Sequence, residues 1–283
     1  FLGIGNPTTQ IEAAPMALSL FHTVFNITNL LILIWFTKWI ACIVSKIIPM
    51  KEKGEDAFTL KHIKIGLLST PDASLFQAKE EIVLYGKNTR DMFHRVTECL
   101  DLSPKDFDQP FEKLTKMEDE SDNVEIEIAN YLTKVSESKL STENSKRIRS
   151  MFKIVSEIES IADSSLNVAK TIYRRNEQHV TFPEELTRKL KHMFALVEET
   201  LDVMCNNLAM EYKTVNAKKA YEMEKAINDY RTVLKQEHLI AIEEKKYDYP
   251  TGILYNDMFS ECEKIGDFAI NVTQAVKEIG YDE

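Results

Sequence analysis

The sequence predicts an all-α protein in which an apolar helix precedes six long helices. Only 8 of the 283 residues are glycine, and none lies between Gly86 and Gly252. This scarcity argues against glycine-rich phosphate loops and against the many tight turns of an all-β fold. Candidate helix starts beyond residue 71 delimit segments of about 25–35 residues, which exceed the usual length of globular helices. Charge is uneven as well, because residues 1–50 contain few charged side chains and the acidic excess lies beyond them.

The first element is an apolar stretch over residues 17–36, with no charged side chain before Lys38. A bilayer core about 30 Å thick needs about 20 helical residues, and Trp35 and Trp39 stand where aromatic rings favour the interface. We therefore predict a transmembrane helix within a membrane domain over residues 1–49. A buried helix of a soluble protein is the alternative, whereas a signal peptide would have a shorter apolar run.

Lysines that follow this stretch predict its orientation, because positive charge accumulates on the cytoplasmic side. The remainder of the chain is therefore expected in the cytoplasm. Within the stretch, His22, Asn26 and Asn29 fall on one helical face, and we predict an intramembrane polar face there. Such a face either lines a watery pathway or hydrogen-bonds to neighbouring helices.

Residues 50–71 are predicted to form a polar connector, and six helices follow it. Most of the six starts place Ser, Thr or Pro at a cap or first-turn position. Apolar residues then recur at intervals of three and four, as expected for helices with one buried face. The starts are Pro71–Asp72, Ser103–Pro104, Ser141–Thr142, Phe182–Pro183, Thr214–Asn216 and Tyr249–Pro250.

An internal repeat divides the six helices into two sets of three. Residues 157–168 and 261–272 share Glu, Glu, Ile, Asp, Asn and Val in the same order and spacing. Upstream, Met117, Glu118 and Asp122 have the spacing of Met223, Glu224 and Asn228. We therefore predict three-helix repeats over residues 72–178 and 179–283.

Paired acidic residues recur in register across the two repeats. Pairs one helical turn apart place two carboxylates on one face, which suits a hard cation or an iron or manganese site between helices. A solvated acidic face is the alternative. We predict iron, manganese or magnesium at Glu118, Asp122, Glu159, Asp163, Glu224, Glu263 and Asp267, with Asn167, Asn228 and Asn271 as outer or weak ligands.

Other chemistries lack their motifs, and we predict no catalytic residues and no enzyme activity. None of the six histidines has Glu three residues before it, as a ferritin-like di-iron site requires, and the sequence has no HExxH and no Walker loop. Cys42, Cys99, Cys205 and Cys262 form no CxxC motif, as expected in a reducing compartment. The acidic balance argues against nucleic-acid binding.

The segment Glu263-Lys-Ile-Gly-Asp267-Phe-Ala-Ile-Asn271 resembles the signature of the PhoU domain. This resemblance implies a PhoU-like tandem three-helix bundle, a role in the control of phosphate uptake, and multinuclear metal binding at the paired carboxylates. Asn228 departs from the pattern, since the family has an acid at that position.

Two further segments resemble the bacterial sodium-dependent phosphate (type II Na/Pi) cotransporter family. The stretch His22-Thr-Val-Phe-Asn26 is similar to the end of its membrane domain, and residues 60–71 are similar to the piece that joins this domain to a PhoU-like domain. The resemblance implies the C-terminal portion of a sodium-coupled phosphate symporter in the bacterial inner membrane, with phosphate and sodium as partners and self-association as a homo-oligomer.

The sequence begins at Phe1 in the middle of a pattern, so the phosphate and sodium sites would then lie before this residue. We assign no residues to these sites. The alternative is a membrane-tethered PhoU-like signalling or scaffold protein that controls phosphate uptake without transporting.

Overall fold

The computed structural model describes residues 15, 18–31, 60–63, 70–215 and 217–280. The chain divides into two compact units, residues 1–57 and 58–283. In the first unit, residues 18–31 are helical and every described side chain is exposed. The repeat boundaries within the second unit, like the predicted limit of the membrane domain at residue 49, stay predictions.

The predicted membrane span is described only in part, because residues 17 and 32–36 lie outside the described ranges. Among the residues that the structure describes, no helix is both long and apolar enough to cross a bilayer. The transmembrane helix therefore stays a prediction. The predicted polar face does lie on a helix, where Asn26 Nδ2 is 3.5 Å from His22 Nδ1 and Asn29 is exposed.

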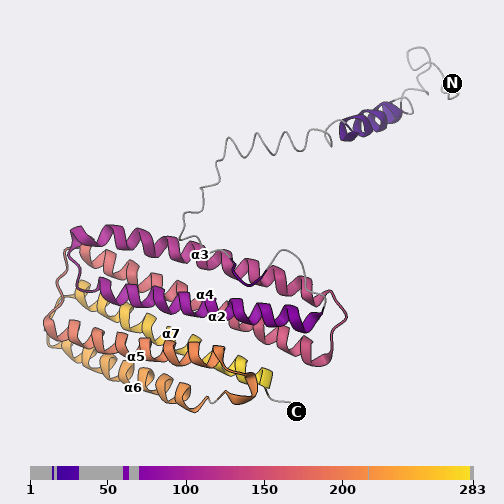
Figure 1. Cartoon of the computed structure of the whole chain (residues 1–283). Coiled ribbons are helices and arrows are strands. Elements are labelled where there is room, and N and C mark those ends of the chain that lie inside the picture. The colour runs from indigo at the N-terminus through magenta and orange to yellow at the C-terminus, as the bar shows by residue number, and fades with distance from the viewer. Residues whose placement is uncertain (1–14, 16–17, 32–59, 64–69, 216, 281–283) are drawn as a thin grey trace, which may run out of the picture. The chain divides into compact units, whose positions relative to one another are not determined.

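The described residues of the second unit form six long helices, as predicted (Figure 1). Thr70 and Ser141 cap two of them, because their hydroxyl oxygens accept hydrogen bonds from the backbone N–H groups of Ala73 and Asn144. A short 3₁₀ turn, η2 (Tyr212–Thr214), precedes the fifth helix, which begins at Lys218 just beyond the predicted start. The helices are α2 (Pro71–Cys99), α3 (Pro104–Ser136), α4 (Thr142–Glu177), α5 (Glu184–Ala209), α6 (Lys218–Glu243) and α7 (Tyr249–Gly280).

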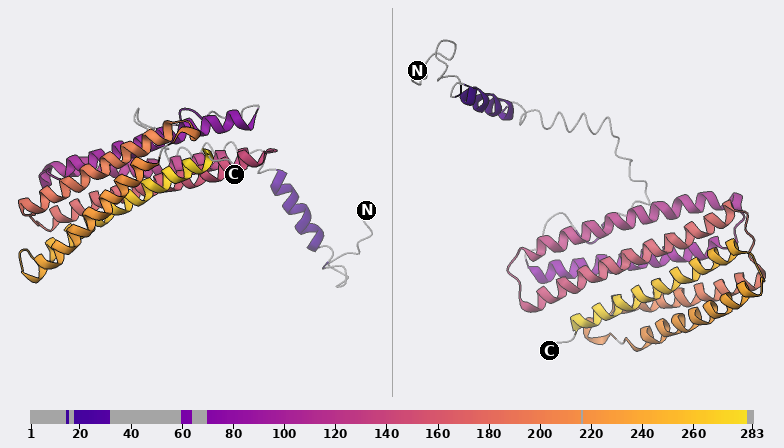
Figure 2. Two further views of the ribbon diagram at one scale, coloured as in Figure 1. Left: turned by 90° about the horizontal axis from the view of Figure 1, so that it is seen from below. Right: turned by 180° about the vertical axis from the view of Figure 1, so that it is seen from behind.

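The six helices pack as two sets of three that lie side by side (Figures 1 and 2). Helices α4 and α7 make the most extensive contact and join the two sets, and α2 also packs against α5. Helices α3 and α6 lie at the outer edges, where α3 packs on α2 and α4 while α6 packs on α5 and α7. The acidic stripes of α3 and α4 therefore belong to adjacent helices, as do those of α6 and α7.

Apolar side chains fill the space between the two sets. Phe93 of α2 and Phe194 of α5 are buried and meet edge to face, with ring centroids 5.8 Å apart. At the α6–α7 contact, a Cβ atom on Gly266 would lie 3.0 Å from Ile227 Cδ1. A glycine at this position therefore lets α6 approach the acidic stripe of α7 closely.

Part of the predicted connector is fixed to the bundle by Glu81 of α2. This residue is only 3% exposed, and its carboxylate accepts hydrogen bonds from the backbone N–H groups of Lys61, His62 and Ile63 at 3.2, 2.6 and 3.3 Å. Leu60 and Ile63 pack against the core beside it. Burial of the carboxylate is compensated by these three donors.

Candidate functional site

Acidic residues of α3 and α4 form one cluster, which we call the first carboxylate cluster: Glu118, Asp122 and Glu125 from α3, and Glu159 and Asp163 from α4. The pKa of Glu159 is shifted most by this environment. Burial raises its pKa to about 7, and repulsion from Glu125, Asp163 and Asp122 adds to the effect. The two pairs that the sequence predicted on separate helices are therefore brought together.

The three acids of α3 also have raised pKa values. Burial raises the pKa values of Glu118 and Asp122, and the charge of Asp163 raises both further, while Lys170 acts to lower the pKa of Glu118. Glu125, whose pKa is also raised by burial and by Asp122, was not predicted. Its spacing of seven residues from Glu118 places it on the same stripe, so helical periodicity contained the signal.

The donor chemistry of this cluster fits a hard cation, which prefers carboxylate oxygens. A cation would also relieve the repulsion that raises the pKa of Glu159. In the ranges that the structure describes, however, no three Asp, Glu, His or Cys side chains lie close enough to share one ion. The packing supplies adjacent carboxylates rather than a finished ligand set.

The second carboxylate cluster lies between α6 and α7 and contains Glu224, Asn228, Glu263 and Asp267. Here the guanidinium of Arg231 forms an ion pair with Glu263, and Asn228 Nδ2 donates a hydrogen bond to Glu224 Oε1 at 2.5 Å. Burial raises the pKa of Asp267. The negative charges of Glu263 and Glu224 raise this pKa further, whereas Arg231 acts to lower it.

The positive charge of the second cluster is thus supplied by the chain itself. A metal ion does not fit beside Arg231, because the guanidinium already holds the Glu263 carboxylate and an amide replaces one acid. Sequence reasoning missed Arg231, although it follows Glu224 by seven residues and so lies on the same helical stripe.

Two predicted outer ligands make other contacts. Asn271 Nδ2 donates a hydrogen bond to Glu157 Oε2 at 3.1 Å, which links α7 to α4. Asn167 lines a groove with Arg174 and Asp257. Their role as outer ligands stays a prediction.

Two adjoining three-helix sets with acidic stripes on neighbouring helices define a class, the tandem three-helix bundle. Residues 82–172 match the model of the PhoU domain. The chain therefore contains a PhoU domain, and the match lies within the first helix set, which carries the first carboxylate cluster.

Relatives support the same assignment. The chain is 25% identical over 189 residues, 64% of its length and 82% of the other protein, to the phosphate-specific transport system accessory protein PhoU homolog of Clostridium acetobutylicum. It shares the fold of PhoU from Pseudomonas aeruginosa, with a TM-score of 0.67 at 16% identity over 74% of this chain and 98% of that one. The phosphate transport system regulatory protein PhoU from Streptococcus pneumoniae gives a TM-score of 0.63 at 16% identity, over 74% and 96%.

These matches confirm the PhoU-like, all-helical part of the sequence prediction. They do not show membership of the type II Na/Pi cotransporter family.

Proposed function

We propose that the chain is a PhoU-like regulatory protein that controls phosphate uptake without itself transporting phosphate. The observation that supports this proposal most strongly is the PhoU domain match at residues 82–172, set within a fold that extends over both helix sets. The matching proteins are described as accessory or regulatory rather than as transporters. This favours the non-transporting alternative over the symporter.

Phosphate uptake distinguishes the two functions. The full chain would be expressed in a bacterium whose own PhoU gene is deleted, and uptake of radioactive phosphate would be measured in sodium and in potassium medium. A regulator should restore the response to external phosphate equally in both media. Uptake that requires sodium, in proteoliposomes containing only this chain, would overturn the proposal in favour of a symporter.

We further propose that the first carboxylate cluster binds iron, manganese or magnesium through Glu118, Asp122, Glu159 and Asp163, joined by Glu125. When bound, the metal would neutralise carboxylates that otherwise repel one another. The chain's own contribution is to hold acidic stripes of α3 and α4 on adjacent helices. The structure favours one loaded cluster rather than the two that the sequence predicts, because Arg231 pairs with Glu263 in the second.

Metal content of the purified chain tests this assignment. Asp122→Asn with Asp163→Asn should abolish manganese binding in calorimetry, whereas Glu127→Gln, which removes an exposed carboxylate of α3, should not. If the wild type, the double variant and Glu127→Gln bound manganese equally, the first carboxylate cluster would be excluded as the metal site.

Attachment to the bacterial inner membrane through residues 17–36 belongs to the same proposal. Carbonate extraction of membranes containing the full chain, beside a variant that lacks residues 1–57, tests it. The full chain should stay in the membrane fraction and the shortened chain should not, and release of both would remove the tether from the proposal.

A further inference from the structure

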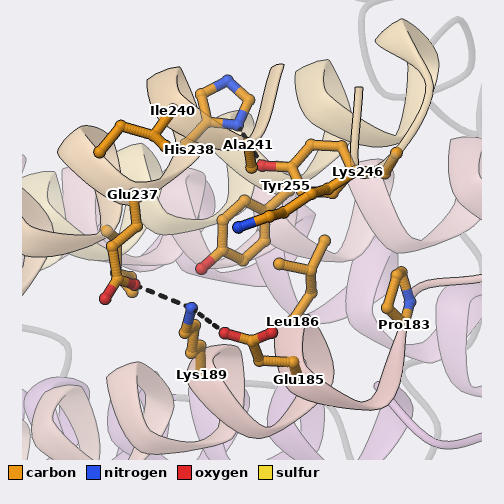
Figure 3. Close-up of a pocket in the computed structure, with 12 residues that line it drawn as sticks. Pro183, Glu185, Leu186, Lys189, Glu237, His238, Ile240, Ala241, Lys246 and Tyr255 are labelled. Carbon is orange, nitrogen blue, oxygen red and sulfur yellow. Dashed lines mark hydrogen bonds and ion pairs between the residues drawn. The ribbon is translucent and has the colours of Figure 1, made fainter. Parts of the chain in front are cut away.

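A cavity of about 340 Å³ lies in the second helix set, where α5 and α7 begin and α6 ends (Figure 3). Its volume is near the lower limit of pockets that bind small molecules. Leu186, Leu234 and Ala241 supply apolar walls, and polar groups reach the cavity from all three helices. The cavity is separate from both carboxylate clusters, whose residues do not line it.

Tyr255 of α7 brings an unsatisfied polar group to this cavity. The residue is 1% exposed, and among the described residues its hydroxyl has no hydrogen-bond partner. Figure 3 shows the ring among the lining side chains, with the hydroxyl on the side of Lys189. Met151 occupies the matching position of the first repeat and is buried as well, so core packing at this position does not need a hydroxyl. Buried hydroxyl groups without partners are rare because desolvation opposes them.

A partly buried cation, Lys189, lies on the α5 side of the cavity. The side chain of Lys189 is 16% exposed, and its Nζ lies 2.6 Å from Glu185 Oε1 and 2.8 Å from Glu237 Oε2. The two carboxylates are 66% and 48% exposed. The ammonium is therefore held in place, while Glu185 can turn into solvent at little cost and give up its position to another carboxylate.

The other basic groups contribute less positive charge inside the cavity. His238 Nδ1 lies 2.8 Å from the hydroxyl of Tyr247, and burial lowers the pKa of His238, which favours the neutral imidazole at pH 7. Lys246 pairs with Glu244 at 2.7 Å and is 62% exposed. Lys189 is therefore the cation best placed to meet an anionic group within the cavity.

We propose that this cavity binds a small monocarboxylate with an apolar body. The ligand carboxylate would accept a hydrogen bond from the hydroxyl of Tyr255 and pair with Lys189 in place of Glu185, and its apolar body would pack against Leu186 and Leu234. An amine is disfavoured because it would have to displace Lys189, which already pairs with Glu185 and Glu237. A neutral alcohol would satisfy Tyr255 without using the ammonium group.

Phenylacetate is a suitable probe, with 2-phenylethanol and phenethylamine as matched compounds of the same size. Calorimetric titration of the full chain at pH 7 should show the tightest binding for phenylacetate. Tyr255→Phe keeps the ring and removes one hydrogen bond, so it should weaken this binding by about 2- to 10-fold. Lys189→Met should weaken it by at least about 10-fold. Tyr85→Phe, which removes a hydroxyl bonded to Ser121 elsewhere in the core, should leave it unchanged.

Thermal unfolding without the probe gives a second readout. Tyr255→Phe should not lower the melting temperature of the empty protein, since no hydrogen bond is lost, whereas Tyr85→Phe should lower it. Phenylacetate should raise the melting temperature of the wild-type chain. The proposal is overturned if phenylacetate does not bind, if the three compounds bind equally, or if Tyr255→Phe binds phenylacetate as tightly as the wild type.

Discussion

Replacing Glu159 by Gln should stabilise the metal-free protein at alkaline pH. This residue lies on α4 in the first carboxylate cluster, where burial and then the charges of Glu125, Asp163 and Asp122 raise its pKa to about 7. The folded state therefore binds this proton more tightly than the unfolded state does. As a result, the free energy of unfolding falls as pH rises from the usual value of a glutamate to about 7, and it levels off above that.

The size of the effect follows from the pKa. A rise from 4.5 to about 7 corresponds to about 3 kcal/mol at most, and solvent screening of these partly exposed carboxylates reduces it to about 1–2 kcal/mol. Glu159→Gln preserves the shape of the side chain and cannot ionise. It should therefore raise the free energy of unfolding at pH 8 by about 1–2 kcal/mol and make it less dependent on pH between 5 and 7.

Urea titrations in the presence of a chelator, followed by circular dichroism from pH 5 to 8, measure this difference. Glu127→Gln is the control, because it removes an exposed carboxylate from the neighbouring helix α3 and should keep the wild-type dependence on pH. If Glu159→Gln were less stable than the wild type at pH 8, or kept the full dependence on pH, the cluster would not impose the repulsion inferred here.

Three further substitutions test other parts of the structure. Arg231→Met should lower the free energy of unfolding by about 1–3 kcal/mol, since it leaves the Glu263 carboxylate without its cation, and calorimetry should show additional manganese binding; unchanged stability would contradict the ion pair. Glu81→Ala should speed hydrogen exchange of the amides at residues 61–63 without affecting α4, and slow exchange there would show that the three hydrogen bonds are dispensable. Phe93→Ala should cost about 3–5 kcal/mol in urea unfolding, because it leaves a cavity against Phe194; a loss below about 1 kcal/mol would argue against this contact.

Helix positions were predictable because their signals are local. Ser141 caps the helix that follows it, and Pro71 and Pro104 occupy first-turn positions, as the sequence indicates. The start of α6 was harder to place, because the 3₁₀ turn η2 occupies residues 212–214 just before it. Short turns that depend on packing against α7 have a weak local signal.

The candidate sites were predictable only in part. Spacing placed Glu159 and Asp163 on one face of a helix, yet it could not show that the acids of α3 face them. Sequence reasoning assigned no role to Tyr255, because its place in a cavity depends on residues of α5 and α6 that line the same cavity. These relations join residues that are distant in sequence, and helical periodicity does not reach across helices.

The sequence by itself determined the six helices and the recurring carboxylate spacing, because capping, propensity and periodicity act within one helix. Its apolar head predicts a membrane helix over residues 17–36, of which the structure describes residues 18–31. Only the tertiary structure decided that the two acidic clusters differ. Packing of α3 against α4 brings five carboxylates together, whereas packing of α6 against α7 places Arg231 on Glu263. The physical reason is that electrostatic energy depends on distance in space, which the fold sets, rather than on spacing along the chain.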